Sequence, residues 1–304
     1  MNPLRDQIIL EMLPDKRRMH LRNGPIDLIV EAMGDAAEVA ASYRQAAETF
    51  APILDDLTAE LDILRAPISG VQVPPKGPIT RAMAQAADTL CGGAFATPMI
   101  AVAGAVADHV LHAMLRGRCL DRAYVNNGGD ISLFLGPAQR FDVGICGDVV
   151  TSGIASVVKI AQGDKIGGIA TSGWQGRSHS LGIADAVTVL AETAAQADTA
   201  ATVIANAIDL PGHPGIARTR ADILSPDSDL RHRLVTTGVG RLSGAECRQA
   251  LEAGQRVARR LIDQGLISAA YGYLQGHCFA TRQRLNSANS MRRVLPTSQG
   301  YANA

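Results

Sequence analysis

The chain has 304 residues, enough to bury an ample core in one domain or in two interlocked halves. It carries 29 basic and 29 acidic residues, and aromatic side chains make up only 4% of it. Balanced charge and few aromatic rings argue against nucleic acid and anionic membranes as partners, because phosphates and bases lack their usual contacts. The composition is typical of a soluble globular protein.

The cysteines and the N-terminal sequence bear on where the protein works. Five cysteines occur without a C-x-x-C pair, a pattern typical of reduced thiols in a cytoplasm and unlike a zinc or iron–sulfur site. The N-terminal residues contain no apolar segment of signal-peptide type. We therefore expect a cytoplasmic protein with buried or incidental thiols, in which Cys91 before Gly92-Gly93 is a small core residue.

The first half of the chain is predicted to hold a hairpin followed by helices. Residues Arg17–Leu21 and Ile26–Val30 flank an Asn23-Gly24 turn, which is typical of a β-hairpin. Helical spacing then runs from Asp35 to Leu64 and is interrupted near Pro52, so two helices are expected. A loop over residues 67–78 precedes two further helices, over residues 80–90 and 98–115.

The last of these helices lies in the longest uncharged run, Thr89–Ala107. Its length would suit a membrane span, but its glycines and alanines and the following Asp108 favour a buried helix. Thr97 is predicted to cap this helix, with Pro98 at its first position.

The second half is predicted to supply most of the sheet. Strands are expected at Arg122–Val125, Ile131–Leu135, Arg140–Ile145, Ile154–Ile160 and Ala186–Ala191. A helix follows over Ala194–Ile208, and Ser243 with Glu246 forms a capping box that opens another helix.

Three segments complete the expected organisation. Residues 216–243 are expected to form a charged, partly helical excursion, Tyr271–Tyr273 a last short strand, and residues 284–304 a disordered tail. We therefore predict an α+β fold with a mixed β-sheet flanked by helices, in a single domain over residues 1–283.

Two motifs in the second half could carry chemistry. Asn126-Asn127-Gly128-Gly129-Asp130 joins two predicted strands, and its glycines would let a ligand approach bare backbone. Asp198 and Thr202 are four residues apart, so on a helix their oxygens share one face and could hold a hard cation such as Mg²⁺. Each motif also has a simpler interpretation, a plain hairpin turn for the first and a first-turn acid with a half-buried hydroxyl for the second.

The order and spacing of these motifs resemble the ApbE superfamily, whose best-known members are FAD:protein FMN transferases. That family shows a Gly-Gly-Asp turn, an Ala-Thr-Ser-Gly segment, a Val-Thr-Val strand and a helix with an Asp-x-x-x-Thr motif. The corresponding segments here are Gly128–Asp130, Ala170–Gly173, Val187–Val189 and Asp198–Thr202. Residues Thr97–Ala105 and Ser178–Ala186 resemble the soluble branch of the superfamily, which lacks a lipoprotein signal. The resemblance covers most of residues 20–210 and implies an ApbE-like fold.

The resemblance also implies roles for individual residues. The Gly128-Gly129 turn with Asn127 and Asp130 would line a flavin-nucleotide pocket. Asp198, Thr202 and the backbone carbonyl of Ala170 would bind Mg²⁺, which would bridge the pyrophosphate of FAD.

Further candidate ligand contacts come from the Ala-Thr-Ser-Gly segment itself and from the loop that follows it. These are Thr171, Ser172, Gly173 and Arg177. His179 is a candidate acid or base, although a solvated loop histidine would look the same, and Arg177 could equally form a surface ion pair.

One departure from the family pattern leaves the reaction open. Flavin transferases of the superfamily carry a His-x-x-Asp-Pro-x-Thr-Gly stretch, whereas Ser180–Ala184 follow His179 here without Asp-Pro or Thr-Gly. Two functions are therefore considered. One is Mg²⁺-dependent transfer of FMN from FAD to an acceptor protein. The other is a non-catalytic flavin-binding or accessory protein that supports a client redox enzyme in sulfur or heterocycle metabolism.

Overall fold

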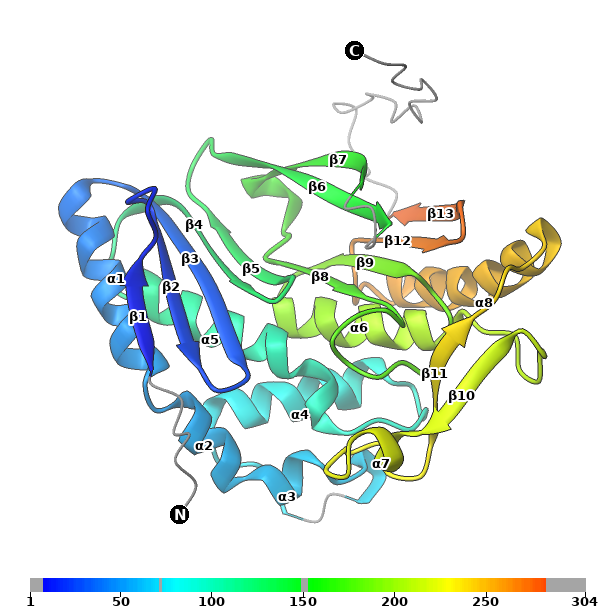
Figure 1. Cartoon of the computed structure of the whole chain (residues 1–304). Helices are drawn as coiled ribbons and strands as arrows, with labels where there is room; N and C mark the ends of the chain where they lie inside the picture. The colour runs from blue at the N-terminus through cyan, green and yellow to red at the C-terminus, as the bar shows by residue number, and fades with distance from the viewer. Residues whose placement is uncertain (1–7, 71–72, 149–152, 283–304) are drawn as a thin grey trace.

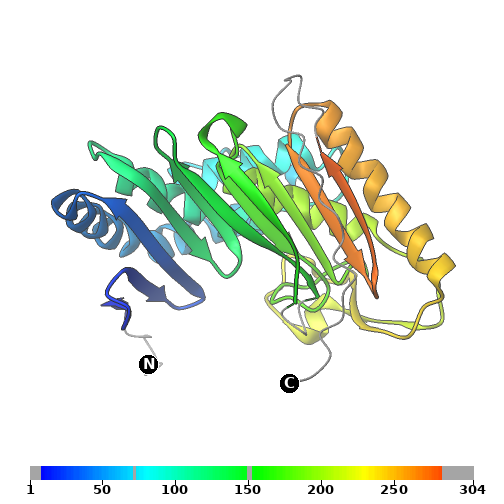
Figure 2. The ribbon, with the colours of Figure 1, turned by 90° about the horizontal axis from the view of Figure 1, so that it is seen from above.

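The computed structural model describes residues 8–70, 73–148 and 153–282. Within them, nine strands form one large sheet in which every pairing is antiparallel (Figures 1 and 2). In spatial order the strands are β1 (Ile9–Met12), β2 (Arg18–Asn23), β3 (Ile26–Gly34), β4 (Leu120–Asn127), β5 (Asp130–Leu135), β8 (Gly168–Ser172), β9 (Ala186–Ala191), β12 (Ala269–Leu274) and β13 (His277–Arg282). The first five strands come from the first half of the chain, and they meet the second half where β5 pairs with β8.

Helices cover one face of this sheet (Figure 1). The longer ones are α1 (Ala36–Phe50), α4 (Pro78–Leu90), α5 (Val102–Leu115), α6 (Ala194–Ala207) and α8 (Gly244–Asp263). Shorter turns of helix are α2 (Ile53–Ala59), α3 (Leu61–Leu64), η1 (Ile68–Gly70), η2 (Pro98–Ala101) and η3 (Gln162–Asp164). The main hydrophobic core lies between these helices and the sheet.

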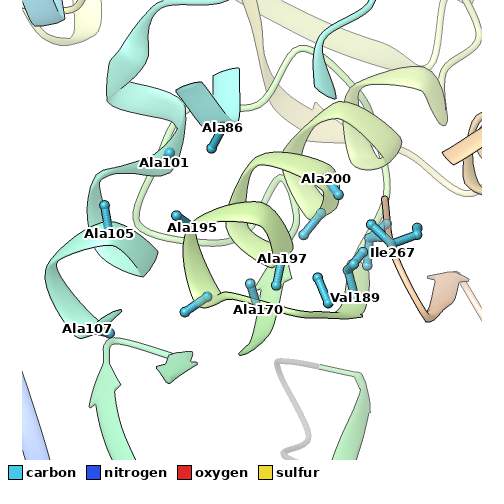
Figure 3. Close-up of a cluster of buried hydrophobic side chains, with 14 of the residues drawn as sticks. Ala86, Ala101, Ala105, Ala107, Ala170, Val189, Ala195, Ala197, Ala200 and Ile267 are labelled. Atoms are coloured by element: carbon cyan, nitrogen blue, oxygen red, sulfur yellow. The ribbon is translucent and has the colours of Figure 1, made fainter. Parts of the chain in front are cut away.

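Small side chains dominate the centre of that core, where α5 and α6 lie against β8. Ala105 on α5, Ala195 and Ala197 on α6 and Ala170 on β8 are all buried (Figure 3). A Cβ at Gly104 would lie 2.2 Å from the Ala194 carbonyl oxygen, so glycine is required for the two helices to approach this closely. The many small residues of the sequence thus allow α5 and α6 to pack closely at their N-terminal ends.

The apolar helix expected in the run around Pro98 is a core element. Residues Pro98–Leu115 have the length and the mean hydropathy, 1.4, of a membrane-spanning helix, but 56% of that stretch is buried inside the protein. Thr97 and Pro98 take the predicted cap and first positions, but in a 3₁₀ turn, and the Thr97 side chain makes no capping hydrogen bond. The Thr97 hydroxyl instead donates to Asp229, and the chain passes through the 3₁₀ turn η2 before α5 begins at Val102.

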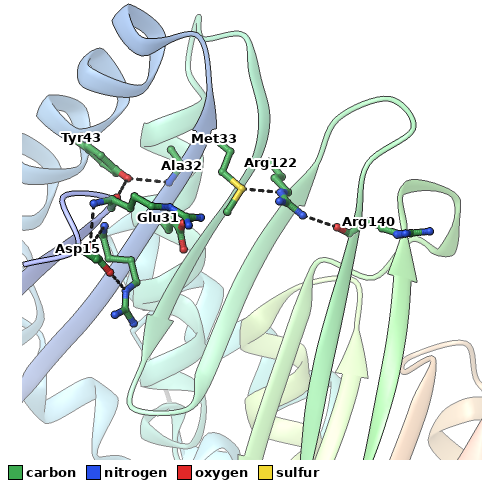
Figure 4. A network of polar contacts seen from close by, with 9 residues as sticks. Asp15, Glu31, Ala32, Met33, Tyr43, Arg122 and Arg140 are labelled. Atoms are coloured by element: carbon green, nitrogen blue, oxygen red, sulfur yellow. Dashed lines mark hydrogen bonds and ion pairs between the residues drawn. The ribbon is translucent and has the colours of Figure 1, made fainter. Parts of the chain in front are cut away.

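The opposite face of the sheet is partly covered by the hairpin of β6 (Arg140–Asp148) and β7 (Gly153–Ala161). A second apolar cluster lies between this hairpin and the sheet, formed by Leu133, Leu135, Ile145, Ile160, Ile169, Leu190 and Ala269. Arg122 joins the two layers, since its guanidinium donates to the Arg140 carbonyl and its Nε contacts the Met33 sulfur (Figure 4). Polar contacts around Glu31, including an ion pair with Arg17, continue along this face.

The predicted α+β class and the helix-flanked sheet are confirmed, and strand direction is the one refinement. Neighbouring strands of the described sheet are antiparallel because they follow one another as hairpins or return after a helix. The hairpin at Asn23-Gly24, the helix break near Pro52 and the Ser243–Glu246 capping box are present as expected.

Two segments differ from expectation. Residues 216–243 are mainly a hairpin of β10 (Ile216–Arg220) and β11 (Leu234–Val239), with only the short α7 (Ala221–Leu224) helical. The apolar alternation is hidden by Arg218 and Arg220 on β10 and by two threonines and a glycine on β11. Strand β12 is followed by β13, which was not predicted, and the expected tail over 284–304 lies outside the described residues.

Candidate functional site

The predicted motifs meet where the β4–β5 turn lies beside the end of β8 and the beginnings of α5 and α6. Gly128 and Gly129 form the turn with φ values of 64° and 115°, which favour glycine. The Gly129 amide donates to the Asn126 side-chain oxygen at 2.8 Å and so closes the turn. The sheet alternates across this turn. Asn127 and Asp130 therefore lie on the helix side, while Asn126 lies on the opposite face.

On the helix-covered side of the sheet, Asp198 and Thr202 share one face of α6, and Thr202 lies next to the end of β8. The Thr202 hydroxyl lies 3.3 Å from the Ser172 hydroxyl. Asp198 Oδ2 accepts the Gly104 amide at 3.0 Å, and the Ala103 amide also contributes, so the carboxylate lies at the N-terminal end of α5. Both side chains, those of Asp198 and Thr202, are partly buried.

A second carboxylate, that of Asp130, lies close enough to interact with Asp198. Burial raises the pKa of the Asp130 carboxyl to about 7, although an amide hydrogen bond from Thr171 lowers it. Burial, followed by the negative charge of Asp130, raises the pKa of Asp198 above its ordinary value. The pair therefore needs a shared proton or a cation to be stable in this environment.

Asp108 on α5 completes the arrangement from the other helix. Its carboxylate accepts the Ala194 and Ala195 amides at 3.0 and 2.9 Å and the Ser132 hydroxyl at 2.6 Å. Asp108 thus caps α6 while Asp198 on α6 caps α5, so each helix holds the N-terminus of the other. Burial raises the pKa of Asp108 as well.

The oxygen atoms on the helix side suit Mg²⁺. Two carboxylates, the Thr202 and Ser172 hydroxyls and the backbone of Ala170 on buried β8 provide only oxygen donors. Among the described residues no three His, Cys, Asp or Glu side chains cluster in a way that could hold a metal ion, so a cation here would depend on two carboxylates together with neutral oxygens. The competing role of Asp198 is the helix cap already described, and one of its oxygens is occupied by that role.

On the other side of the turn lies a hollow of about 220 Å³. It is lined by Asp27, Ile29, Asn126, Gly128, Gly129 and Arg177. A Cβ at Gly128 would lie 3.2 Å from the Arg177 guanidinium, so the bare backbone there makes room for this cation. We refer to it below as the Arg177 hollow.

A second hollow, of about 330 Å³, lies next to Trp174 and Gln175, which precede Arg177 in the loop after β8. Its lining is Trp174, Gln175, Asp185, Val239, Tyr273, Gln275 and Gly276. The Asp185 carboxylate is already engaged, because it accepts the Trp174 indole at 3.1 Å and the Gln275 amide at 2.7 Å. Gly173, the last residue of the Ala-Thr-Ser-Gly segment, is held tightly, since a Cβ there would lie 2.2 Å from the Asp185 carbonyl oxygen.

The remaining predicted residues have partners within the protein. Asn127 Nδ2 donates to the Ala103 carbonyl at 3.1 Å, and the Thr171 and Thr188 hydroxyls lie 2.9 Å apart. His179 Nε2 lies 3.1 Å from the Ser225 hydroxyl, so its ring faces the excursion at 216–243. The thiol of Cys91 is buried, which raises its pKa to about 11 and removes it as a nucleophile.

Two residues of the site were not predicted. Asp108 directly follows the apolar run, which favours a helix end and gives no sign of a cap for a second helix. Asp27 lies about 100 residues before the turn in the sequence and reaches it only through the β3–β4 pairing. No local pattern could have revealed either residue.

Comparison with known proteins places this architecture in a family. The family model described as AbpE bacteria matches residues 10–280. Among curated proteins, the UPF0280 protein of Methanothrix thermoacetophila is 36% identical over 132 residues, which are 43% of this chain and 52% of the relative. That of Methanosphaerula palustris is 37% identical over 145 residues, 47% of this chain and 57% of the relative. The chain thus spans about half the length of the curated relatives it matches.

Two solved structures match this chain over most of its length with little shared sequence. The flavin transferase ApbE from Vibrio cholerae is 12% identical with a TM-score of 0.42, over 90% of this chain and 98% of that one. The flavinyl transferase ApbE of Pseudomonas stutzeri is 13% identical with a TM-score of 0.40, over 93% and 97%.

Taken together, the sheet, the crossed helices and the glycine turn define an α+β protein with an oxygen-rich site at its strand ends. Since the family model covers most of its length, the chain belongs to the AbpE bacteria family, and the membership predicted from the motifs is confirmed.

Proposed function

We propose that this protein binds a flavin nucleotide such as FAD together with Mg²⁺ at the ends of β4 and β8. The observation that carries the proposal is the pair of partly buried carboxylates, Asp130 and Asp198. They lie beside the Gly128-Gly129 turn, whose other side faces the Arg177 guanidinium. Two neighbouring negative charges in a poorly hydrated place favour a divalent cation, and bare amides with Arg177 favour a phosphate next to it.

In this proposal Asp198, Asp130, Thr202 and the Ala170 carbonyl hold Mg²⁺ and orient it toward the turn. The ion would neutralise the charge of a pyrophosphate when bound. Arg177 and the Gly128-Gly129 amides would fix the phosphates from the open side of the turn. The N-terminal amides of α5 orient Asp198, and Asp108 fixes the start of α6.

Calorimetric titration with FAD, in the presence of Mg²⁺ and of EDTA, tests this proposal. FAD should bind with Mg²⁺ and bind weakly without it. Asp198→Asn keeps the shape but removes the charge, so metal-dependent affinity should fall on the order of ten- to a hundredfold. Glu192→Gln, on an exposed side chain just before α6, is the matched charge control and should bind as the wild type does. Absence of FAD binding by the wild-type protein would reject the proposal.

Transfer of FMN from FAD to an acceptor protein is the second candidate function. Family membership favours it, but the stretch where transferases carry Asp-Pro-x-Thr-Gly serves packing in this chain. A Cβ at Gly182 would lie 2.0 Å from the Ala205 carbonyl oxygen, and the Leu181 amide donates to Asn206 on α6. We therefore favour binding without transfer, as in an accessory protein that supports a redox enzyme.

Release of AMP from FAD separates the two candidates. A transferase should release AMP in the presence of Mg²⁺ and an acceptor protein, and mass spectrometry should find the mass of FMN on a threonine or serine of that acceptor. Intact FAD alongside tight binding would support the binding function and reject transfer.

A further inference from the structure

We propose that the Arg177 hollow binds the ribose phosphate part of a nucleotide, with Asp27 accepting hydrogen bonds from the sugar hydroxyls and Arg177 pairing with the phosphate. This inference rests on the proposed function and assigns one part of the ligand to one place. Asp27 belongs to none of the predicted motifs, because it lies on β3, far from them in the sequence.

The polar groups of the hollow fit a ligand that carries both an anion and hydroxyl groups. Arg177 is exposed, and among the described side chains it has no carboxylate within ion-pair distance. Asn126 uses its oxygen to accept the Gly129 amide, which leaves its Nδ2 protons for an acceptor such as a phosphate or sugar oxygen. Asp27 can only accept when it is charged, so it suits the hydroxyl protons of a sugar.

The Asp27 carboxylate is held in place from behind. The His20 ring nitrogen Nε2 lies 2.9 Å from Asp27 Oδ1, and since a carboxylate oxygen can only accept, the ring donates. The second oxygen, Oδ2, has no described hydrogen-bond partner and remains for a ligand. A carboxylate that reads a ribose diol next to a phosphate-binding backbone is a recurring arrangement in nucleotide sites.

The size and the polar lining of the hollow favour a small, polar part of a nucleotide. The hollow measures about 220 Å³, below the roughly 300–1,000 Å³ of pockets that enclose a whole drug-sized ligand. Among the described residues that line it, Ile29 is the only apolar side chain, and none has an aromatic ring on which a base or a flavin could stack. A five-membered sugar with one phosphate matches both limits. Trp174 and Tyr273 line the other hollow, which is the better place for an aromatic ring.

Binding of ADP and of 2′,3′-dideoxyADP to the wild-type protein, at one Mg²⁺ concentration, tests the inference directly. If Asp27 accepts hydroxyl hydrogen bonds, ADP should bind more tightly than the dideoxy compound by on the order of ten- to a hundredfold. Equal affinities would overturn the inference without any need for a variant.

Variants then assign the discrimination to Asp27. Asp27→Asn should reduce the ratio of ADP to dideoxyADP affinity toward one. It should leave pyrophosphate binding unchanged or stronger, because the carboxylate no longer repels the anion. Arg177→Gln should weaken pyrophosphate, ADP and dideoxyADP alike and leave the ratio as in the wild type. Loss of all three ligands in Asp27→Asn, or a persisting ratio, would contradict the assignment.

Glu11→Gln is the matched control for charge. Glu11 lies 3.8 Å from the other nitrogen of His20 and does not line the hollow, so this variant removes one nearby negative charge without touching a ligand. The ratio should be that of the wild type. Titration with FAD separates the two proposals. FAD binding with no ribose discrimination would reject the inference alone, whereas no binding of FAD or ADP would reject both.

Discussion

Gly128 combines a backbone conformation and a contact that can be tested separately. Its φ of 64° costs an alanine about 1–2 kcal/mol, and a Cβ there would also press on the Arg177 guanidinium at 3.2 Å. Gly128→Ala should therefore lose about 1–2 kcal/mol in the free energy of unfolding and bind pyrophosphate several-fold more weakly. Urea denaturation and calorimetry measure the two effects.

Gly117 provides the matched control for this change. It has nearly the same φ, 67°, but no atom within 4 Å of its Cβ position, and it follows the far end of α5. Gly117→Ala should lose similar stability and keep wild-type pyrophosphate affinity. If Gly128→Ala also kept that affinity, the placement of Arg177 over the turn would not matter for anion binding.

The Asp130 carboxyl makes stability depend on pH in an unusual direction. Its pKa in the folded protein, about 7, lies above the ordinary value of 3.8, so the folded state binds the proton more tightly than the unfolded state. Its contribution is therefore present at low pH and is lost as the pH rises from about 4 toward about 7. In EDTA, Asp130→Asn should be at least as stable as the wild type near pH 7.5, and the difference should shrink near pH 5.

Mg²⁺ should reverse that dependence, because the ion stabilises the charged carboxylates and competes with the proton. Urea denaturation at both pH values, with and without Mg²⁺, tests this point. A wild-type protein whose stability difference from Asp130→Asn did not change with pH would show that Asp130 is ordinarily hydrated.

Among the elements, the crossed helices α5 and α6 depend on each other's carboxylates. Asp108→Ala leaves two amides of α6 and the Ser132 hydroxyl without their acceptor, so the protein should lose about 1–3 kcal/mol in the free energy of unfolding. Because Asp198 lies on α6, the helix whose N-terminus Asp108 caps, the Mg²⁺-dependent affinity for FAD should fall too.

An ordinary cap separates these two consequences. Asp35 caps α1 through the Ala37 amide at 2.9 Å, and Asp35→Ala should cost about 1 kcal/mol while FAD affinity stays unchanged. If Asp108→Ala lost stability but not ligand affinity, the start of α6 would not position the site.

Elements with local signals were predicted from the sequence, and elements that depend on distant contacts were not. The Asn23-Gly24 turn and the Ser243–Glu246 capping box each carry their own short-range signal. Strand β10 carries Arg218 and Arg220, β11 carries two threonines and a glycine, and β13 begins with His277 and ends with Arg282, so pairing with neighbouring strands is what makes these segments strands. Thr97 carried a cap signal, but Asp229 from another segment takes its hydroxyl.

The candidate site follows the same rule. The four-residue spacing correctly places Asp198 and Thr202 on one face of α6, because helix geometry alone determines it. Asp27 and Asp108 join the site only through sheet pairing and helix crossing, which no local pattern encodes.

For the whole molecule, the site occupies the seam between the two parts of the large sheet. The turn after β4 comes from the first part, and β8 and α6 come from the second, while β5 and β8 pair at only two positions in the register. A ligand that contacts both sides would therefore tie the two parts together. Whether the chain folds as one domain or as interlocked halves stays a prediction.

Mg²⁺ and FAD should then stabilise this molecule cooperatively. Under the proposed function, the pyrophosphate would meet the charges of Asp130 and Asp198 without the ion, and with the ion the same carboxylates would help to bind the ligand. Thermodynamic linkage requires that each ligand raise the binding affinity of the other by the same factor, and coupling free energies of about 1–3 kcal/mol are typical. Thermal unfolding should show a larger rise in Tm with both ligands than the sum of the separate rises.

Asp198→Asn should make the two rises in Tm additive and leave the effect of FAD alone unchanged or larger, because the variant removes the charge that repels the pyrophosphate and couples the two ligands. Additive rises in the wild-type protein would mean that the ion and the nucleotide bind at separate places. Calorimetry in both orders of addition provides the second measurement, since a true coupling must give the same factor whichever ligand is bound first.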